Sequence, residues 1–182
     1  MYVSKFFMNQ KGKVISAGLV THEKSNAYSK NIYLLPVPMD RIKKFGYDIS
    51  PAHVGNLINS IDFYVPEGTP IFAAASGTVT KVMDNSKSKG NTIEYWDKGN
   101  FIELKHKNCE RTHYEHLKYK GIKVKIGQKV IAGEIIGFGG NTGFTEKPHL
   151  HFQVNKYKSR KNFVTLKARF SNFVDVYRIR RA

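Results

Sequence analysis

The chain has 182 residues, 41% of them hydrophobic, and its 30 Lys and Arg against 14 Asp and Glu give a formal net charge of +16. This length suits one domain with some residues to spare, and the apolar content can bury a core without disulfide bonds. A single cysteine, Cys109, excludes an internal disulfide framework. No run of 18 apolar residues occurs, so the sequence predicts no transmembrane helix.

The excess of positive charge predicts adsorption to polyanions, for which nucleic acid, an acidic membrane and an anionic cell wall are the candidates. A plain gain in solubility is the alternative explanation. The sequence contains no helix-turn-helix pattern, zinc-finger cysteines or RNP-like motif, so no specific nucleic-acid binding is expected. The first residues lack an apolar segment of signal-peptide length, and the export route therefore stays open.

The predicted elements begin with a polar, irregular extension over residues 1–31, which has weak strand character at 14–20. An apolar run at 31–38, stopped by two prolines, predicts an edge strand. Residues 40–60 are expected to form a loop with helical turns. Short β-rich runs then follow one another at 71–75, 78–83, 91–96, 101–107, 111–117, 149–154 and 162–170.

Short strands separated by glycines and polar clusters, without a helix of ten residues, predict an all-β, mainly antiparallel single-domain β-sandwich or barrel. The segment 127–137 looks like the turn of lipoyl and biotinyl carriers, but their lysine hairpin is absent, so only a shared barrel-sandwich geometry is inferred. We expect an extension at 1–31, a domain at 32–170 and a basic tail at 171–182.

His149 and His151 flank one residue of a predicted strand, so their side chains share a face, roughly 7 Å apart. That spacing suits one metal ligand and one neighbour, although two exposed histidines on a polar face would give the same pattern. Asp62, His53 and His116 are further candidates, because a catalytic zinc keeps three histidine or carboxylate ligands and a water molecule. Each of them taken alone is more often a structural residue.

The order of these residues resembles the lysostaphin-type (LytM-like) zinc metallopeptidases, the peptidoglycan DD-endopeptidase family. Their pattern is a histidine, an aspartate, Y-x-H-L and H-x-H, and the chain has His53, Asp62, YEHL at 114–117 and HLH at 149–151. The stretches 62–82 and 127–154 are similar too, so the resemblance covers about residues 32–170. Two departures are the eight residues between His53 and Asp62, where three are usual, and the Glu-Lys pair at 146–147, where small residues are usual.

The resemblance implies that His53, Asp62 and His151 bind Zn²⁺ and that His116 and His149 are catalytic. One of these two histidines would take a proton from the attacking water and the other would stabilise the oxyanion; the sequence does not decide which residue has which role. The implied reaction is hydrolysis of stem or cross-bridge peptide bonds of peptidoglycan, in the periplasm, at the cell surface or after secretion. The alternative is a non-catalytic member that binds the cell wall or activates a hydrolase; such members usually lack zinc ligands.

Other residues leave alternatives open. His106 can be a hydrogen-bonding partner of the site or a surface residue. His113 is expected on the strand face opposite His116, with a structural role. The basic residues from Lys156 onward can form a solvated face or a patch for anionic wall polymers. Three aromatic residues can either pack in the core or line a cleft: Tyr64, Tyr95 and Trp96.

Overall fold

The computed structural model describes residues 5–8, 14–18, 27–47, 50, 52–159 and 162–171. These residues form β-strands and four short 3-10 turns, and none of them lies in an α-helix. The strands β1 (Lys5–Met8) and β2 (Val14–Gly18) pair antiparallel, so the strand character predicted at 14–20 is found in β2. No helix of the described part has the length and apolar character needed to cross a bilayer.

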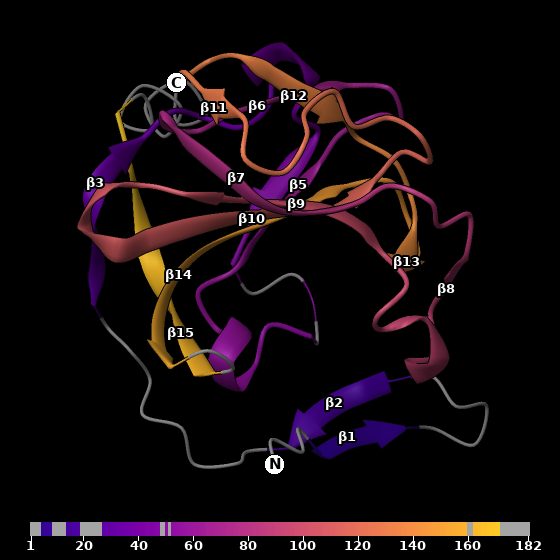
Figure 1. Cartoon of the computed structure of the whole chain (residues 1–182). Helices are drawn as coiled ribbons and strands as arrows, with labels where there is room; N and C mark the ends of the chain where they lie inside the picture. The colour runs from indigo at the N-terminus through magenta and orange to yellow at the C-terminus, as the bar shows by residue number, and fades with distance from the viewer. Residues whose placement is uncertain are drawn as a thin grey trace, which may run out of the picture.

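A sheet of nine strands forms the body of the molecule, in the order β11-β7-β9-β10-β14-β15-β3, with β5 paired to β14 and β4 paired to β5 (Figure 1). Every pair is antiparallel except β15 and β3, and the sheet curls so that β14 and β15 turn away from the plane of β7, β9 and β10. The strands are β3 (Tyr28–Tyr33), β4 (Lys44–Gly46), β5 (Ile61–Tyr64), β7 (Gly77–Met83), β9 (Asn100–Lys105), β10 (Glu110–Leu117), β11 (Lys129–Val130), β14 (Leu150–Ser159) and β15 (Asn162–Phe170). The predicted all-β, mainly antiparallel class is confirmed.

Two smaller pairings complete the fold. β6 (Pro70–Phe72) pairs with β12 (Ile135–Phe138), and β8 (Lys89–Gly90) pairs with β13 (Gly143–Phe144) in parallel. The 3-10 turns are η1 (Met39–Arg41), η2 (Gly55–Leu57), η3 (Ile93–Tyr95) and η4 (Lys107–Cys109).

The strand predicted at 91–96 is wrong, because η3 occupies this segment. Trp96 packs against Phe144 with ring centroids 5.5 Å apart, so a tertiary contact of an aromatic side chain overrides its preference for strands. The predicted edge strand at 31–38 is confirmed only at 31–33: β3 lies at the end of the sheet and stops at Tyr33, and residues 34–38 are not in a strand. The division at residues 31/32 and 170/171 stays a prediction.

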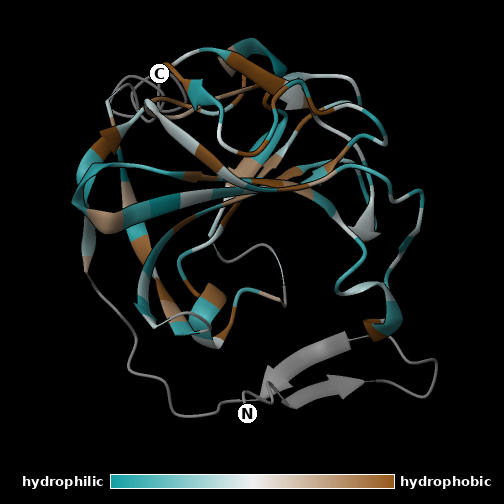
Figure 2. Ribbon diagram, in the orientation of Figure 1, coloured by the Kyte–Doolittle hydropathy of each residue, from teal (hydrophilic) through white to brown (hydrophobic). Residues whose placement is uncertain are grey.

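The two faces of the sheet differ in character, as the alternation of polar and apolar residues along the strands shows (Figure 2). In β14, Leu150, Phe152 and Val154 face the apolar core and are fully buried. The residues between them are His151, Gln153 and Asn155, which are polar and buried as well. Since successive side chains of a strand point to opposite faces, one face of the sheet covers the core and the other forms a sheltered polar floor.

Candidate metal centre

Strand pairing places two of the predicted ligands side by side. Asp62 of β5 lies directly opposite His151 of β14, and Asp62 Oδ1 is 3.0 Å from His151 Nδ1. His53 approaches from the loop before η2, with its Nε2 3.1 Å from Asp62 Oδ1 and 3.3 Å from His151 Nδ1. All three residues are buried, and they form a group able to hold a metal ion. The turn through Gly55, whose φ is +56°, lets the eight intervening residues return His53 to Asp62.

Outer hydrogen bonds fix which atoms of the two histidines face inward. His53 Nδ1 lies 2.5 Å from the Tyr47 carbonyl, to which it donates, and this leaves a lone pair on Nε2. His151 Nε2 lies 3.0 Å from Gln153 Oε1, and donation there leaves a lone pair on Nδ1. With both rings neutral, three acceptor atoms face one another inside the protein, an arrangement that a cation completes.

The donor set fits zinc. Two imidazole nitrogens and one carboxylate oxygen are ligands that zinc uses in catalytic sites. Tetrahedral bonds of about 2.0 Å separate neighbouring donor atoms by roughly 3.3 Å. The three separations of 3.0, 3.1 and 3.3 Å match that value.

The pKa shifts of Asp62 and His151 also indicate that this group of residues binds a positive charge. Burial raises the pKa of Asp62, but its contacts with the His151 and His53 rings outweigh burial and hold the pKa of Asp62 well below its usual range. Burial lowers the pKa of His151, yet the hydrogen bond and charge of Asp62 prevail and raise it to about 8. In the ion-free protein a proton on His151 therefore balances Asp62, and a bound cation would displace that proton.

His116 and His149 lie beside this group, with ring centroids 4.5 Å apart. His116 Nδ1 donates to the Thr142 carbonyl at 2.8 Å, and His149 Nδ1 donates to the Lys147 carbonyl at 2.8 Å. Burial, aided by His149, lowers the pKa of His116 to about 3, and burial also lowers the pKa of His149. Both rings are therefore neutral at pH 7, each with an unprotonated Nε2.

A β-bulge at His116 changes the direction of the neighbouring side chains. The register of β10 against β9 shifts between Glu115 and Leu117, and His116 has a φ of +63°. Side chains three positions apart on a regular strand point to opposite faces. The extra residue of the bulge reverses this alternation, so His113 and His116 both line the groove. The prediction that His113 faces away from His116 is wrong for this reason.

The polar floor and the surrounding loops enclose a groove with a volume of about 540 Å³. Its lining includes Tyr64 and Trp96, so these aromatics line a cleft, and Tyr64 also stacks on His149 with centroids 5.2 Å apart. His106 follows neither expectation: it is buried and binds the Ser76 carbonyl and the Thr112 hydroxyl, inside the fold.

Two further groups of residues at the groove belong to no motif in the sequence. Gln153 and Asn155 continue the face of His151 at every second position, and this period of two was the signal that could have identified them. The second group comes from neighbouring strands, and no local pattern joins its members: Lys81, Glu103 and Tyr157 line the groove, and Arg111 contacts Glu103 from β10.

Comparisons with known proteins agree with this geometry. A model described as Peptidase family M23 matches residues 56–163. The peptidoglycan DD-endopeptidase ShyA of Vibrio cholerae is 31% identical over 155 residues, covering 79% of this chain and 33% of ShyA.

Two solved structures share the fold. A zinc containing peptidase from Vibrio cholerae has a TM-score of 0.51 and 26% identity, covering 76% of this chain and 38% of that chain. The catalytic domain of lysostaphin from Staphylococcus simulans has a TM-score of 0.50 and 32% identity, covering 67% of this chain and 87% of that chain. The chain spans a third or less of the length of the curated relatives it matches.

Proposed function

Because the chain belongs to peptidase family M23, we propose that it is a zinc-dependent endopeptidase that hydrolyses peptide bonds of bacterial peptidoglycan. The single observation that carries the proposal is the convergence of three inward-facing acceptor atoms on His53, Asp62 and His151 in the floor of a groove. A groove of this volume can take a short peptide, and a metal ion at its floor would lie within reach of the peptide backbone.

In this proposal His53, Asp62 and His151 hold the zinc. When bound, zinc acts as a Lewis acid that polarises a carbonyl and makes water nucleophilic near neutral pH. The attacking water must lose a proton, and the unprotonated Nε2 of His116 or His149 can accept it. Once that ring has accepted the proton, its Nε2–H can donate a hydrogen bond to the oxyanion or pass the proton to the leaving amine. The backbone carbonyls bound to each Nδ1 keep both rings turned toward the groove.

The alternative is a non-catalytic member of the family that binds the cell wall or activates another hydrolase. All three proposed ligands and both proposed catalytic histidines are present and lie together, and this favours the enzyme. An activator would need neither zinc nor intact His116 and His149.

The wider setting is proposed with the activity. ShyA is named a peptidoglycan DD-endopeptidase, and by that similarity we place the action of this protein outside the cytoplasm, with residues 32–170 as its catalytic domain. The charge of +16 supports a second partner, an anionic wall polymer bound through the basic surface. Binding to whole cell walls should then weaken steeply between 0.1 M and 1 M salt, while cleavage of a small soluble muropeptide should change little.

The deciding experiment treats defined cross-linked muropeptides with the purified zinc-loaded protein and measures the masses of the fragments. We expect one peptide bond to be cut, a chelator to abolish the cleavage, and added zinc to restore it. Intact muropeptides after prolonged incubation, together with stimulation of a separate wall hydrolase, would favour the non-catalytic alternative.

A further inference from the structure

The groove has a second polar end that the proposed reaction leaves unused. Glu103 of β9 lies at its centre, and its side chain is only 1% exposed. Arg111 of β10 contacts it at 2.6 Å, Lys81 of β7 at 3.3 Å, and the Tyr157 hydroxyl of β14 at 2.7 Å. Four neighbouring strands thus build one charged cluster.

The cluster carries more positive than negative charge. Two cations face one carboxylate, and the carboxylate is the buried member, while the Lys81 and Arg111 side chains are 50% and 28% exposed. Tyr157 limits the freedom of both cations, because Arg111 Cζ lies 4.7 Å and Lys81 Nζ 5.4 Å from the centre of its ring. Exposed cations that are already held in place can bind an anion with little further ordering.

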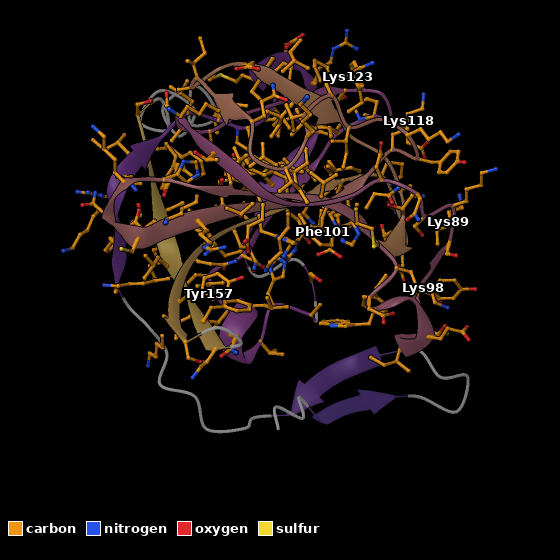
Figure 3. All side chains as sticks on the ribbon, in the orientation of Figure 1. Lys89, Lys98, Phe101, Lys118, Lys123 and Tyr157 are labelled. Carbon is orange, nitrogen blue, oxygen red and sulfur yellow. The ribbon has the colours of Figure 1, made fainter. Side chains whose placement is uncertain are left out.

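The cluster belongs to the same groove as the metal centre, because Lys81 and Tyr157 line it together with His116 and His151. Tyr157 and Phe101, which both line the groove, are labelled below β10 in Figure 3. Tyr157 lies six residues along β14 from His151, about 20 Å at the rise of an extended strand. Glu115 of β10 pairs with His151, and Arg111 lies four residues along β10 from Glu115, about 13 Å.

These separations correspond to about four to six residues of an extended peptide. Charge also sets the direction in which a peptide would lie in the groove. Glu115 and Glu146 line the groove near the metal centre, and their negative charges disfavour a carboxylate there. A carboxylate on the same peptide would be attracted to Lys81 and Arg111 instead.

We propose that Lys81 and Arg111 form an anion subsite that binds a carboxylate of the peptide substrate about four to six residues from the cleaved bond. Glu103 and Tyr157 are positioning residues that hold the two cations. The subsite rests on the proposed peptidase function and deepens it, because it selects substrates with a free carboxylate and sets their direction in the groove.

The test compares a soluble cross-linked muropeptide with the same compound after its carboxyl groups are converted to methylamides. Lys81→Gln removes one exposed cation and should raise KM for the free carboxylate by roughly fivefold to tenfold, with kcat nearly unchanged. The same variant should leave KM for the methylamide unchanged. Lys123→Gln is the matched control, because Lys123 Nζ also lies over an aromatic ring, 5.6 Å from the centre of Phe138, but outside the groove (Figure 3).

A Lys81→Gln variant that behaves like Lys123→Gln, or that affects both substrates equally, overturns the subsite. Binding of the two compounds is measured by calorimetry alongside the kinetics, so the test does not depend on turnover. If the wild-type protein cuts neither compound, the proposed function fails. The subsite still stands in that case if Lys81→Gln weakens binding of the free carboxylate alone, and falls if it does not.

Discussion

At one end of the groove the acceptor atoms of His53, Asp62 and His151 converge to within 3.3 Å of one another. At the other end two cationic side chains converge on Glu103. Both clusters are built on adjacent strands of the same polar floor. The first group lacks a positive charge of its own apart from the proton on His151, whereas the second contains its own counter-charges.

This difference separates a cluster that needs an added cation from one whose buried carboxylate is already balanced by the chain. Facing lone pairs in a buried group repel one another until a proton or metal ion lies between them, so the first cluster gains its free energy only with an added cation. A buried carboxylate with two cations and a hydroxyl donor is satisfied by the chain alone. Substitutions at the two ends should therefore affect different measurements.

The largest effect is expected at Asp62. Asp62→Ala removes the only carboxylate of the metal group, and with it a donor atom and the negative charge that offsets the cation. The purified variant should retain almost no zinc after dialysis, and hydrolysis should be lost. Metal analysis and fragment masses measure both. A variant that still binds one zinc per chain would contradict this expectation, because the metal group would then not need the negative charge of Asp62.

The next effect separates binding of the metal from chemistry. His116→Ala and His149→Ala should keep their zinc and lower kcat by about a hundredfold or more each, as expected for loss of a proton acceptor or an oxyanion donor. His151→Ala should lose both zinc and activity. If His149→Ala releases the metal while His151→Ala retains it, the roles of these two histidines are reversed.

A smaller effect is expected at Gln153, whose side chain accepts from His151 Nε2 and so directs Nδ1 toward the metal group. Gln153→Ala should weaken zinc binding by about tenfold to a hundredfold. Competition with a fluorescent chelator gives the affinity. Asn155→Ala is the control, because Asn155 contacts Gln153 and lies one step further from the ring; an equal loss in both variants would indicate general loosening of β14.

The smallest effect is expected at Glu103, at the charged end of the groove, and concerns the pH dependence of the free energy of unfolding. Burial raises the pKa of Glu103, but hydrogen bonds from Tyr157 and Arg111 prevail and lower it to about 2. A carboxyl group with a lowered pKa stabilises the folded state above its unfolded pKa, and this contribution is lost as the pH falls from about 4.5 toward 2. Glu103→Gln should therefore lower the free energy of unfolding by about 2–3 kcal/mol at pH 7 and by little at pH 2.

Urea denaturation of the metal-free protein at several pH values measures this loss. Glu67 is exposed, and Glu67→Gln is the control that should leave the curve unchanged. A parallel shift of the Glu103→Gln curve at all pH values would mean that packing, and not charge, stabilises this end of the groove.

The sequence predicted the metal end far better than the charged end. His53, Asp62 and the pair at 149–151 stand in a family order, and recognition of that order needs no knowledge of the sheet. The all-β class follows from local alternation and turn residues in the same way. Lys81, Glu103 and Arg111 meet only because β7, β9 and β10 pair in one register, and such long-range pairing has no local signature.

Two local predictions failed for physical reasons. The strand expected at 91–96 is a 3-10 turn, because the Trp96 ring packs against Phe144. The direction of His113 was misjudged because counting positions along a strand assumes that no residue is inserted, and the bulge at His116 inserts one.

The position of β14 in the sheet has a consequence for hydrogen exchange and thermal inactivation of the protein. Its first half is paired with β5 on one edge and β10 on the other, and its second half with β10 and β15. Amide protons held on both edges exchange with solvent mainly when the whole domain opens. His151 is paired on both edges, with Asp62 of β5 and Glu115 of β10, so local fraying at the sheet edges leaves it in place. Heat should consequently remove His151 from the metal group only when the sheet itself unfolds.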